Sequence, residues 1–167
     1  NHLELGEHML GKEYFPNNNL SMSENLKSKL IEYYDFMVGY ENLLRGGEPI
    51  IQQTDITSQE VSIKDWGAQI GSIACIKKEI DNLEVYHMLN FIGLNSLEWR
   101  DNNGILTTPT YHNNFTIEIP IIAGQQIIYS SPDWIDGVQQ KLDYVMENGK
   151  AVVVIPHITY WGMIIVE

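Results

Sequence analysis

The chain has 167 residues, a length that predicts one domain, or one domain plus a fragment of another. With 44% hydrophobic and 19% charged residues, the composition predicts a packed globular core and argues against intrinsic disorder. Ten basic residues against 22 acidic ones give a formal net charge of −12. A surface of that sign repels phosphate backbones and anionic lipid, so we expect no nucleic-acid binding, whereas a neutral carbohydrate is compatible with it. No apolar run reaches the roughly 20 residues of a membrane span, so no membrane insertion is expected.

The first 47 residues predict a strand, a loop and a helix. His2–Leu5 is short and alternating and ends at Gly6, and Phe15–Asn19 has the proline and asparagines of a loop. Ser21-Met22-Ser23-Glu24 has the spacing of a capping box, in which Ser21 accepts a hydrogen bond from the amide of Glu24. We therefore expect a helix to begin here.

The predicted helix covers Met22–Arg45. Apolar residues recur along it at spacings of three and four, which places them on one face: Leu26, Leu30, Tyr33, Met37, Tyr40 and Leu44. Gly46-Gly47 supplies a left-handed stop, and Pro49 prevents continuation. The tyrosines belong to this apolar stripe, so their expected role is packing.

From Glu48 to Glu167 the pattern predicts a β domain, because short β-branched and aromatic runs alternate with turn residues. The predicted strands are Glu60–Ile63, Ile70–Lys77, Glu84–Ile92, Thr116–Ile122, Gln126–Ser130, Gln140–Met146, Ala151–Ile155 and Thr159–Val166. Asn148-Gly149 is a strong hairpin signal and Ala123-Gly124 a weaker one. Eight short strands favour an antiparallel β-sandwich with Greek-key connections.

Motifs for catalysis, cofactors and metals are missing from the sequence. It contains no glycine-rich phosphate loop, no HExxH, no paired CxxC and no GxSxG. We therefore expect no cofactor and no metal. Asp101-Asn102-Asn103 has oxygen atoms that suit calcium, but a turn is the favoured interpretation. Cys75 lies between apolar neighbours, which predicts a buried, inert thiol.

Four tryptophans raise the possibility of carbohydrate binding, because an exposed indole can stack on a sugar face. Trp99 and Trp161 lie in or beside apolar runs, which predicts packing in the core. Trp66 and Trp134 lie in predicted loops and are the candidates for sugar stacking.

Several segments of the chain together resemble the C-terminal part of bacterial dextranases and cycloisomaltooligosaccharide glucanotransferases, glycoside hydrolase family sixty-six. The segments that carry the resemblance are His8–Asn19, Tyr33–Met37, Tyr40–Arg45, His87–Asn95, Trp99–Asp101 and Tyr160–Ile164. The resemblance spans nearly the whole chain in the same order.

The resemblance implies a definite domain organisation. Residues 1–47 would be the last strand, loop and helix of a catalytic (β/α)8 barrel, and residues 48–167 a C-terminal antiparallel β domain with a Greek key. The expected fold class is therefore mainly β, with a barrel fragment in front of it. Because the chain begins with Asn1 and not with Met, we expect it to be a piece of a longer protein.

The resemblance also implies cleavage or transglycosylation of α-1,6-linked glucan with retention, which needs two carboxyl groups about 5–5.5 Å apart. In the family these groups lie upstream of the matching segment, so we expect no catalytic residue here. Glu7 and His8 would follow the last barrel strand and contact sugar hydroxyl groups. Asn17 is a weaker candidate, since a helix-entry turn also explains it. From the residues alone, the cluster of His2, Glu4, Glu7 and His8 around Gly6 is interpreted as a frayed terminus.

Three hypotheses follow for the segment. The first is a non-catalytic end of a secreted or periplasmic glycoside hydrolase, bracing the barrel, with α-glucan as the substrate of the intact enzyme. The second is a carbohydrate-binding β module that uses Trp66 and Trp134, and the third is a purely structural β domain. The Met22–Arg45 helix, without its barrel, would pack on the β domain or form a homodimer. Hydrolase or cyclising transferase, chain-length preference and oligomeric state stay open at this point.

Overall fold

A computed structural model describes residues 23–98 and 104–167. The contacts divide the chain into two compact units, Asn1–Arg45 and Gly46–Glu167. Within the described ranges, every helix is too short or too polar to cross a membrane.

The described part of the first unit is helical. Helix α2 covers Glu24–Gly39 and helix α3 covers Glu41–Arg45. All six residues of the predicted apolar stripe are partly buried, and Phe36, which the prediction left out, is 4% exposed. The rings of Phe36 and Tyr40 lie 4.6 Å apart between centroids. The helical periodicity therefore predicted correctly which face of the helix packs.

Both ends of the predicted helix need correction. Its N-cap is Ser23, whose hydroxyl accepts a hydrogen bond from the amide of Leu26 at 3.2 Å, and not Ser21. The carboxylate of Glu24 pairs with Lys27 instead of reaching back to complete a capping box. The helix is also interrupted at Tyr40, directly after Gly39, whose missing side chain makes it a weak helix former. The predicted stop is confirmed, since Gly47 has a φ of 65°.

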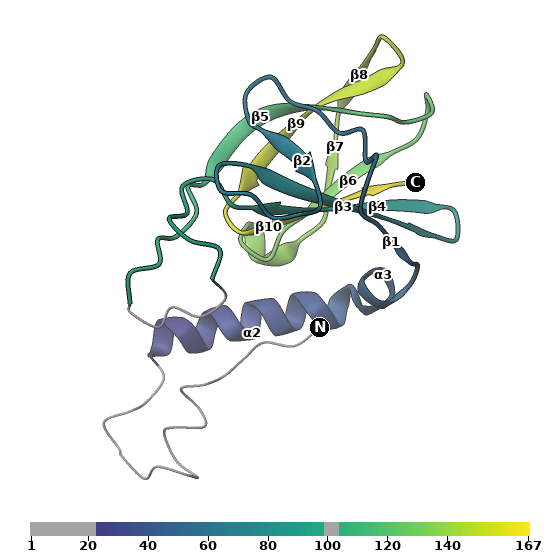
Figure 1. Cartoon of the computed structure of the whole chain (residues 1–167). Helices are drawn as coiled ribbons and strands as arrows, with labels where there is room; N and C mark the ends of the chain where they lie inside the picture. The colour runs from purple at the N-terminus through teal and green to yellow at the C-terminus, as the bar shows by residue number, and fades with distance from the viewer. Residues whose placement is uncertain (1–22, 99–103) are drawn as a thin grey trace. The chain divides into compact units, whose positions relative to one another are not determined.

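The described residues of the second unit form two β-sheets (Figure 1). The large sheet has the order β1-β3-β4-β10-β6-β7, with β2 paired to β3. Its strands are β1 Pro49–Ile50, β2 Ile63–Asp65, β3 Ile73–Ile80, β4 Leu83–Asn90, β6 Ile127–Ser130, β7 Gln140–Leu142 and β10 Trp161–Val166. The small sheet has the order β5-β9-β8, with β5 His112–Ile119, β8 Tyr144–Glu147 and β9 Lys150–Ile158. A short 3-10 turn, η1, covers Ile135–Gly137.

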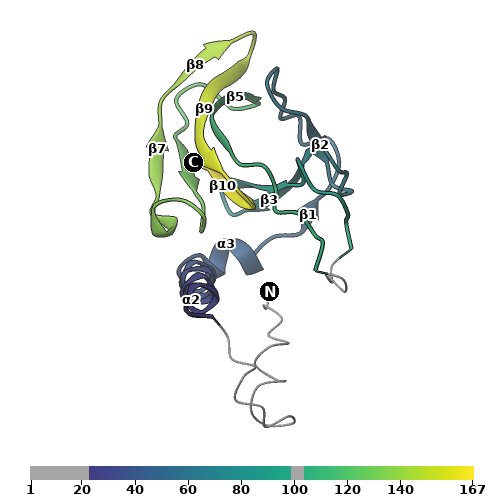
Figure 2. The same cartoon turned by 90° about the vertical axis from the view of Figure 1, so that its left-hand side faces the viewer.

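All strand pairs are antiparallel except β2–β3, which is parallel. The mainly β, antiparallel prediction is thereby confirmed, with this one exception. Most of the predicted strands exist with shifted ends, but Gln140–Met146 is divided. Its first part is β7 in the large sheet and its second part is β8 in the small sheet, with only Asp143 between them. Figure 2 shows these two strands as one rising ribbon that passes from sheet to sheet.

The two hairpin signals have different outcomes. Asn148 and Gly149 have φ values of 49° and 81° and connect β8 to β9, as predicted for a tight turn. Ala123-Gly124 does not form a hairpin, because β5 pairs with β9 whereas β6 pairs with β10 and β7. The sequence signal is local, and it does not show that the chain changes sheets here.

One apolar core lies between the two sheets. Side chains from both sheets form it, and its members include Ile73, Tyr86, Met88, Tyr129 and Ile164 from the large sheet and Phe115, Ile117, Val153 and Ile155 from the small one. Cys75 belongs to this core, and its burial raises the pKa of the thiol to about 12. The prediction of a buried cysteine is confirmed, and its lack of reactivity stays a prediction.

The large sheet is apolar on its other side as well. Residues that alternate with the core residues of β3, β4 and β10 share this side, here called the outer face, and most of them are apolar: Ala74, Ile76, Lys78, Val85, His87, Leu89, Trp161, Met163 and Ile165. Val85 and Met163 are fully buried, and His87 is only 8% exposed. A sheet with two apolar faces is built to be covered on both sides.

Candidate functional site

Three predicted site residues, Glu7, His8 and Asn17, lie outside the described residues, as do Trp99 and the Asp101–Asn103 segment. Their contacts with a ligand stay predictions. Within residues 23–98 and 104–167, no cluster of three His, Cys, Asp or Glu side chains is arranged to hold a metal ion. The candidate site must therefore be sought among the cavities and aromatic groups of the second unit.

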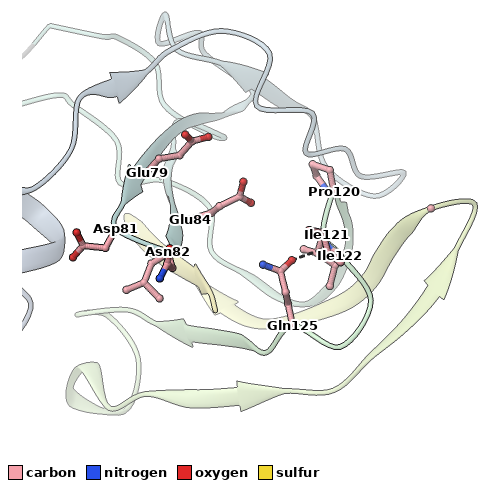
Figure 3. Close-up of a pocket in the computed structure, with 10 residues that line it drawn as sticks. Glu79, Asp81, Asn82, Glu84, Pro120, Ile121, Ile122 and Gln125 are labelled. Carbon is pink, nitrogen blue, oxygen red and sulfur yellow. Dashed lines mark hydrogen bonds between the residues drawn. The ribbon is translucent and has the colours of Figure 1, made fainter.

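A cavity of about 530 Å³ opens where the β3–β4 hairpin faces the β5–β6 connection (Figure 3). Glu79, Asp81, Asn82 and Glu84 line one side of it. The other side is formed by Pro120, Ile121, Ile122 and Gln125. The amide of Ile122 donates to the side-chain oxygen of Gln125 at 2.7 Å, which shapes the connection as a tight turn.

The carboxylate of Glu84 is already engaged at the edge of this cavity. One oxygen lies 2.6 Å from the Lys77 ammonium, and the other accepts a hydrogen bond from the Tyr86 hydroxyl at 2.9 Å. Burial opposes the charge of Lys77, but hydrogen bonds to Glu84 and Glu79 raise its pKa. Burial, and then the charge of Glu84, raise the pKa of Tyr86. Glu84 therefore anchors its neighbours and is not free to act as an acid or a base.

A second cluster lies around Trp134. Its ring centroid is 4.9 Å from that of His157, and the two planes differ by 20°. Tyr111 lies 5.8 Å from the same imidazole, with planes 25° apart. We call Tyr111, His157 and Trp134 the aromatic stack. Tyr111 directly precedes β5, His157 lies near the end of β9, and Trp134 follows β6. Three separate segments of the second unit thus converge on one ring.

Hydrogen bonds fix the backbone that carries the aromatic stack. The Tyr129 hydroxyl donates to the backbone carbonyl oxygen of His157. One carboxylate oxygen of Asp133 accepts from the amides of Tyr160 at 2.9 Å and Trp161 at 3.1 Å, which ties the Trp134 loop to the β9–β10 turn. These bonds hold the backbone on both sides of the stack, so its rings need little ordering before a ligand arrives.

The imidazole of His157 is held by both of its nitrogens. Nδ1 lies 2.5 Å from the side-chain oxygen of Asn113, and Nε2 lies 2.7 Å from the hydroxyl of Thr159. Burial lowers the pKa of His157, although the nearby charge of Asp133 acts in the other direction. His157 is therefore uncharged at neutral pH, and both nitrogens are occupied. This arrangement suits a packing surface and not a general base.

The loop that carries Trp134 has an unusual backbone. Ile135 and Asp136 have φ values of 47° and 50°, a region that a β-branched residue such as isoleucine rarely adopts. The indole Nε1 of Trp134 is buried without a hydrogen-bond partner in the described structure. Both features cost stability. The fold holds the indole ring of Trp134 in this position despite the loss of stability from these two features.

The other tryptophans differ from Trp134. Trp66, in the β2–β3 connection, is 43% exposed, and no aromatic ring in the described residues stacks on it. Trp161 is partly buried, with its ring 5.8 Å from that of His87. Sugar stacking by Trp66 and Trp134 stays a prediction. Of these two tryptophans, only Trp134 has an aromatic neighbour among the described residues.

Sequence reasoning did not single out Tyr111 or His157. They are 46 positions apart in the chain, and their proximity arises from the antiparallel pairing of β5 with β9, which sets Asn113 opposite His157. One signal was available: both lie at the ends of alternating segments, where side chains are accessible.

The comparisons with known proteins identify the protein family. The model of glycosyl hydrolase family 66 matches residues 1–165. The chain belongs to this family.

Two kinds of named relatives are similar to the chain. A cycloisomaltooligosaccharide glucanotransferase of Niallia circulans is 31% identical over 98% of this chain and 18% of its own length. A dextranase of Streptococcus salivarius is 29% identical over 95% of this chain and 22% of its own length. The chain thus spans about a fifth of the relatives that it matches.

A solved structure of the same kind of enzyme is also similar to the chain. The structure of a Paenibacillus sp. cycloisomaltooligosaccharide glucanotransferase, in complex with cycloisomaltoheptaose, matches with a TM-score of 0.75 at 26% sequence identity. The match covers 92% of this chain and 23% of that one. The resemblance stated from the sequence is therefore confirmed.

Proposed function

We propose that this chain is the C-terminal, non-catalytic part of a glycoside hydrolase that acts on α-1,6-linked glucan. Residues 1–47 would be the last strand, loop and helix of its (β/α)8 barrel. Residues 48–167 would be a Greek-key β domain that braces the barrel. The observation that carries the proposal is coverage: almost the whole chain aligns with about a fifth of each enzyme that it resembles.

The outer face of the large sheet supports the bracing role. Val85, Met163 and Ile165 alternate with core residues and are buried, although they lie on the opposite side of the sheet from the core. An apolar face of this kind stabilises a protein only when another element covers it. These three side chains are already buried within this chain, so the part of the face whose cover we assign to the barrel is its half-buried residue Leu89.

Helix α2 supports a barrel in front of the β domain. Ile31 and Val38 expose 60% and 74% of their surface, and Tyr34, Met37, Val38 and Leu44 line a hollow of about 300 Å³ on the helical unit. The outer helices of a barrel pack on neighbouring helices and strands, and missing neighbours would leave such side chains exposed. A homodimer through the same helix is the alternative for the isolated chain.

Two measurements test this proposal. The isolated chain should release no reducing sugar from dextran, while an enzyme that carries the chain at its C-terminal end should do so. In that enzyme, Leu89→Ala, at the half-buried part of the outer face, should lower the thermal midpoint of the barrel while kcat on dextran is unchanged. Hydrolysis by the isolated chain would contradict the non-catalytic assignment, and an unchanged midpoint would contradict the bracing role.

The compartment follows from the substrate proposed. Because dextran is a polymer, an enzyme that acts on it would meet it outside the cytoplasmic membrane, so we propose a secreted or periplasmic parent protein. Fractionation of the producing cells would test this, and recovery of the enzyme in the cytoplasm would contradict it.

A further inference from the structure

Tyr111 is both exposed to solvent and stacked on another ring. It exposes 61% of its surface, yet its ring lies within 25° of parallel to His157. A scattered exposed aromatic residue needs no explanation, but one that is exposed and held in a stack offers a ready-made flat surface. The same imidazole holds Trp134 at 4.9 Å. We propose that the aromatic stack of Tyr111, His157 and Trp134 binds glucose units of a neutral α-1,6-linked glucan.

The charge of the stack selects a neutral ligand. His157 is uncharged near neutral pH because burial lowers its pKa, so it offers no positive charge to an anion. The Asp133 oxygen that faces the turn already accepts two backbone hydrogen bonds, and the chain as a whole carries a net charge of −12. Anions are repelled by this surface.

The chemistry of the rings selects a sugar among neutral ligands. The face of a pyranose ring presents C–H groups, and its edge presents hydroxyl groups. Aromatic rings supply a flat apolar surface for the face, while the phenol of Tyr111 supplies a polar handle for the edge. Asn113 is exposed beside the stack and carries a further amide group. An apolar platform with a few polar groups at its margin is the usual form of such a site.

The rigidity of the stack supports binding over a purely structural role. The Tyr129 hydroxyl, the Asp133 carboxylate and the Ser131 hydroxyl, which donates to the carbonyl oxygen of Trp161 at 2.6 Å, all fix the backbone beneath the rings. Tyr111 is the most exposed of the three rings. Rings fixed in advance lose little conformational entropy on binding.

Affinity electrophoresis of the chain in native gels with and without dextran tests the inference. The unsubstituted chain should be retarded by dextran. Tyr111→Ala should weaken the affinity roughly two- to tenfold, the range expected for loss of one aromatic contact. Tyr111→Phe, which keeps the ring and loses only the hydroxyl, should weaken the affinity less than Tyr111→Ala. Because Tyr111 is exposed, neither variant should change the fold, and the near-ultraviolet circular dichroism spectrum checks this.

Trp66→Ala is the matched control, since Trp66 is an exposed tryptophan of the same unit outside the stack. It should leave retardation unchanged, whereas Trp134→Phe should weaken it. Loss of retardation in Trp66→Ala but not in Tyr111→Ala would overturn the assignment and place the binding surface in the β2–β3 connection. Absence of retardation in the unsubstituted chain would overturn it altogether.

The choice of α-1,6-linked glucan rests on the proposed function, but the two can fail separately. If an enzyme that carries this chain acts on dextran while Tyr111→Ala binds dextran unchanged, only the aromatic stack assignment fails. If the chain binds a different neutral glucan through Tyr111 and the enzyme does not act on dextran, the proposed substrate fails and the stack remains a sugar-binding surface.

Discussion

The side chain of Tyr129 lies directly against Gly162. A Cβ atom at Gly162 would lie 2.5 Å from the Tyr129 hydroxyl oxygen and 2.9 Å from its ring carbon Cε2. The absence of a side chain at this position of β10 therefore gives Tyr129 room to reach across the core to the carbonyl of His157. A glycine in the large sheet thus helps to position a ring of the aromatic stack.

Gly162→Ala should lower the free energy of unfolding by about 1–3 kcal/mol, because overpacking a filled core forces neighbours to move. It should also weaken dextran retardation, because Tyr129 would no longer hold His157. Urea unfolding and affinity electrophoresis measure the two effects. Gly39→Ala is the control, since a Cβ at Gly39 meets no atom within 4 Å. Equal stability of the two variants would contradict the close contact.

His87 should make the fold sensitive to acid. Burial, and then the positive charge of Lys78, lower its pKa from 6.5 to about 4. Between these values the unfolded chain binds more protons than the folded one, so stability falls as the pH decreases from about 6.5 to about 4. The loss amounts to about 3 kcal/mol for a shift of this size.

Replacement by an uncharged side chain checks this. His87→Gln should show a smaller loss of stability between pH 7.5 and pH 5 than the unsubstituted chain, measured by urea unfolding at each pH. The comparison at pH 7.5 serves as the control, because His87 is neutral there in both states. The same pH dependence in both proteins would show that His87 does not contribute.

Cys75 should be unreactive in the folded protein. It is fully buried in the core, and burial raises the pKa of its thiol to about 12. A thiol-specific chromogenic reagent at pH 8 should react with it only when guanidinium chloride unfolds the chain. Stoichiometric reaction within minutes without denaturant would contradict the placement of β3 in the core.

Asp65 should stabilise the segment that leads into β2. Its carboxylate accepts hydrogen bonds from the Thr54 hydroxyl at 2.6 Å and from the amides of Thr54 and Gln53 at 3.1 and 2.8 Å. The Thr54 hydroxyl is the main reason that the pKa of Asp65 is lowered, although burial opposes the shift. This contribution is therefore present above the pKa of the unfolded carboxyl, about 3.9, and is lost as the pH falls through the folded value.

Asp65→Ala leaves these donors without their acceptor and should cost about 0.5–1.5 kcal/mol at pH 7, because water can replace the acceptor at the exposed amide of Gln53. Urea unfolding measures it. Asp81→Asn is the matched control, because Asp81 has a φ of 54° in the β3–β4 turn and asparagine adopts this region readily. If both variants unfolded at the same urea concentration, the three hydrogen bonds would contribute nothing.

The parts of the fold that depend on local pattern were predictable from the sequence. The stop at Gly47 and the Asn148-Gly149 turn need only residues that tolerate positive φ, and the buried Cys75 needs only apolar neighbours. The parts that depend on pairing between distant strands were not predictable. The division of Gln140–Met146 between two sheets has no clear marker in its residues, since no glycine or proline separates the two halves.

The candidate site shows the same limit. Trp134 could be singled out by its residue type and its place in a loop, but the two rings stacked with His157 come from segments that meet only through the β5–β9 pairing and the bonds of Asp133. A single sequence contains no direct record of that pairing. The strained backbone at Ile135 could not be anticipated either, because isoleucine normally argues against a positive φ.

Strand β10 is the last strand of the chain, yet it lies inside the large sheet, between β4 and β6. During synthesis, β4 would leave the ribosome about seventy residues before its partner in β10. The edge of β4 that pairs with β10 therefore stays unpaired for several seconds at ordinary translation rates of about 5–20 residues per second. Exposed strand edges are templates for aggregation, so the β domain should depend on slow or chaperone-protected folding until Val166 has emerged.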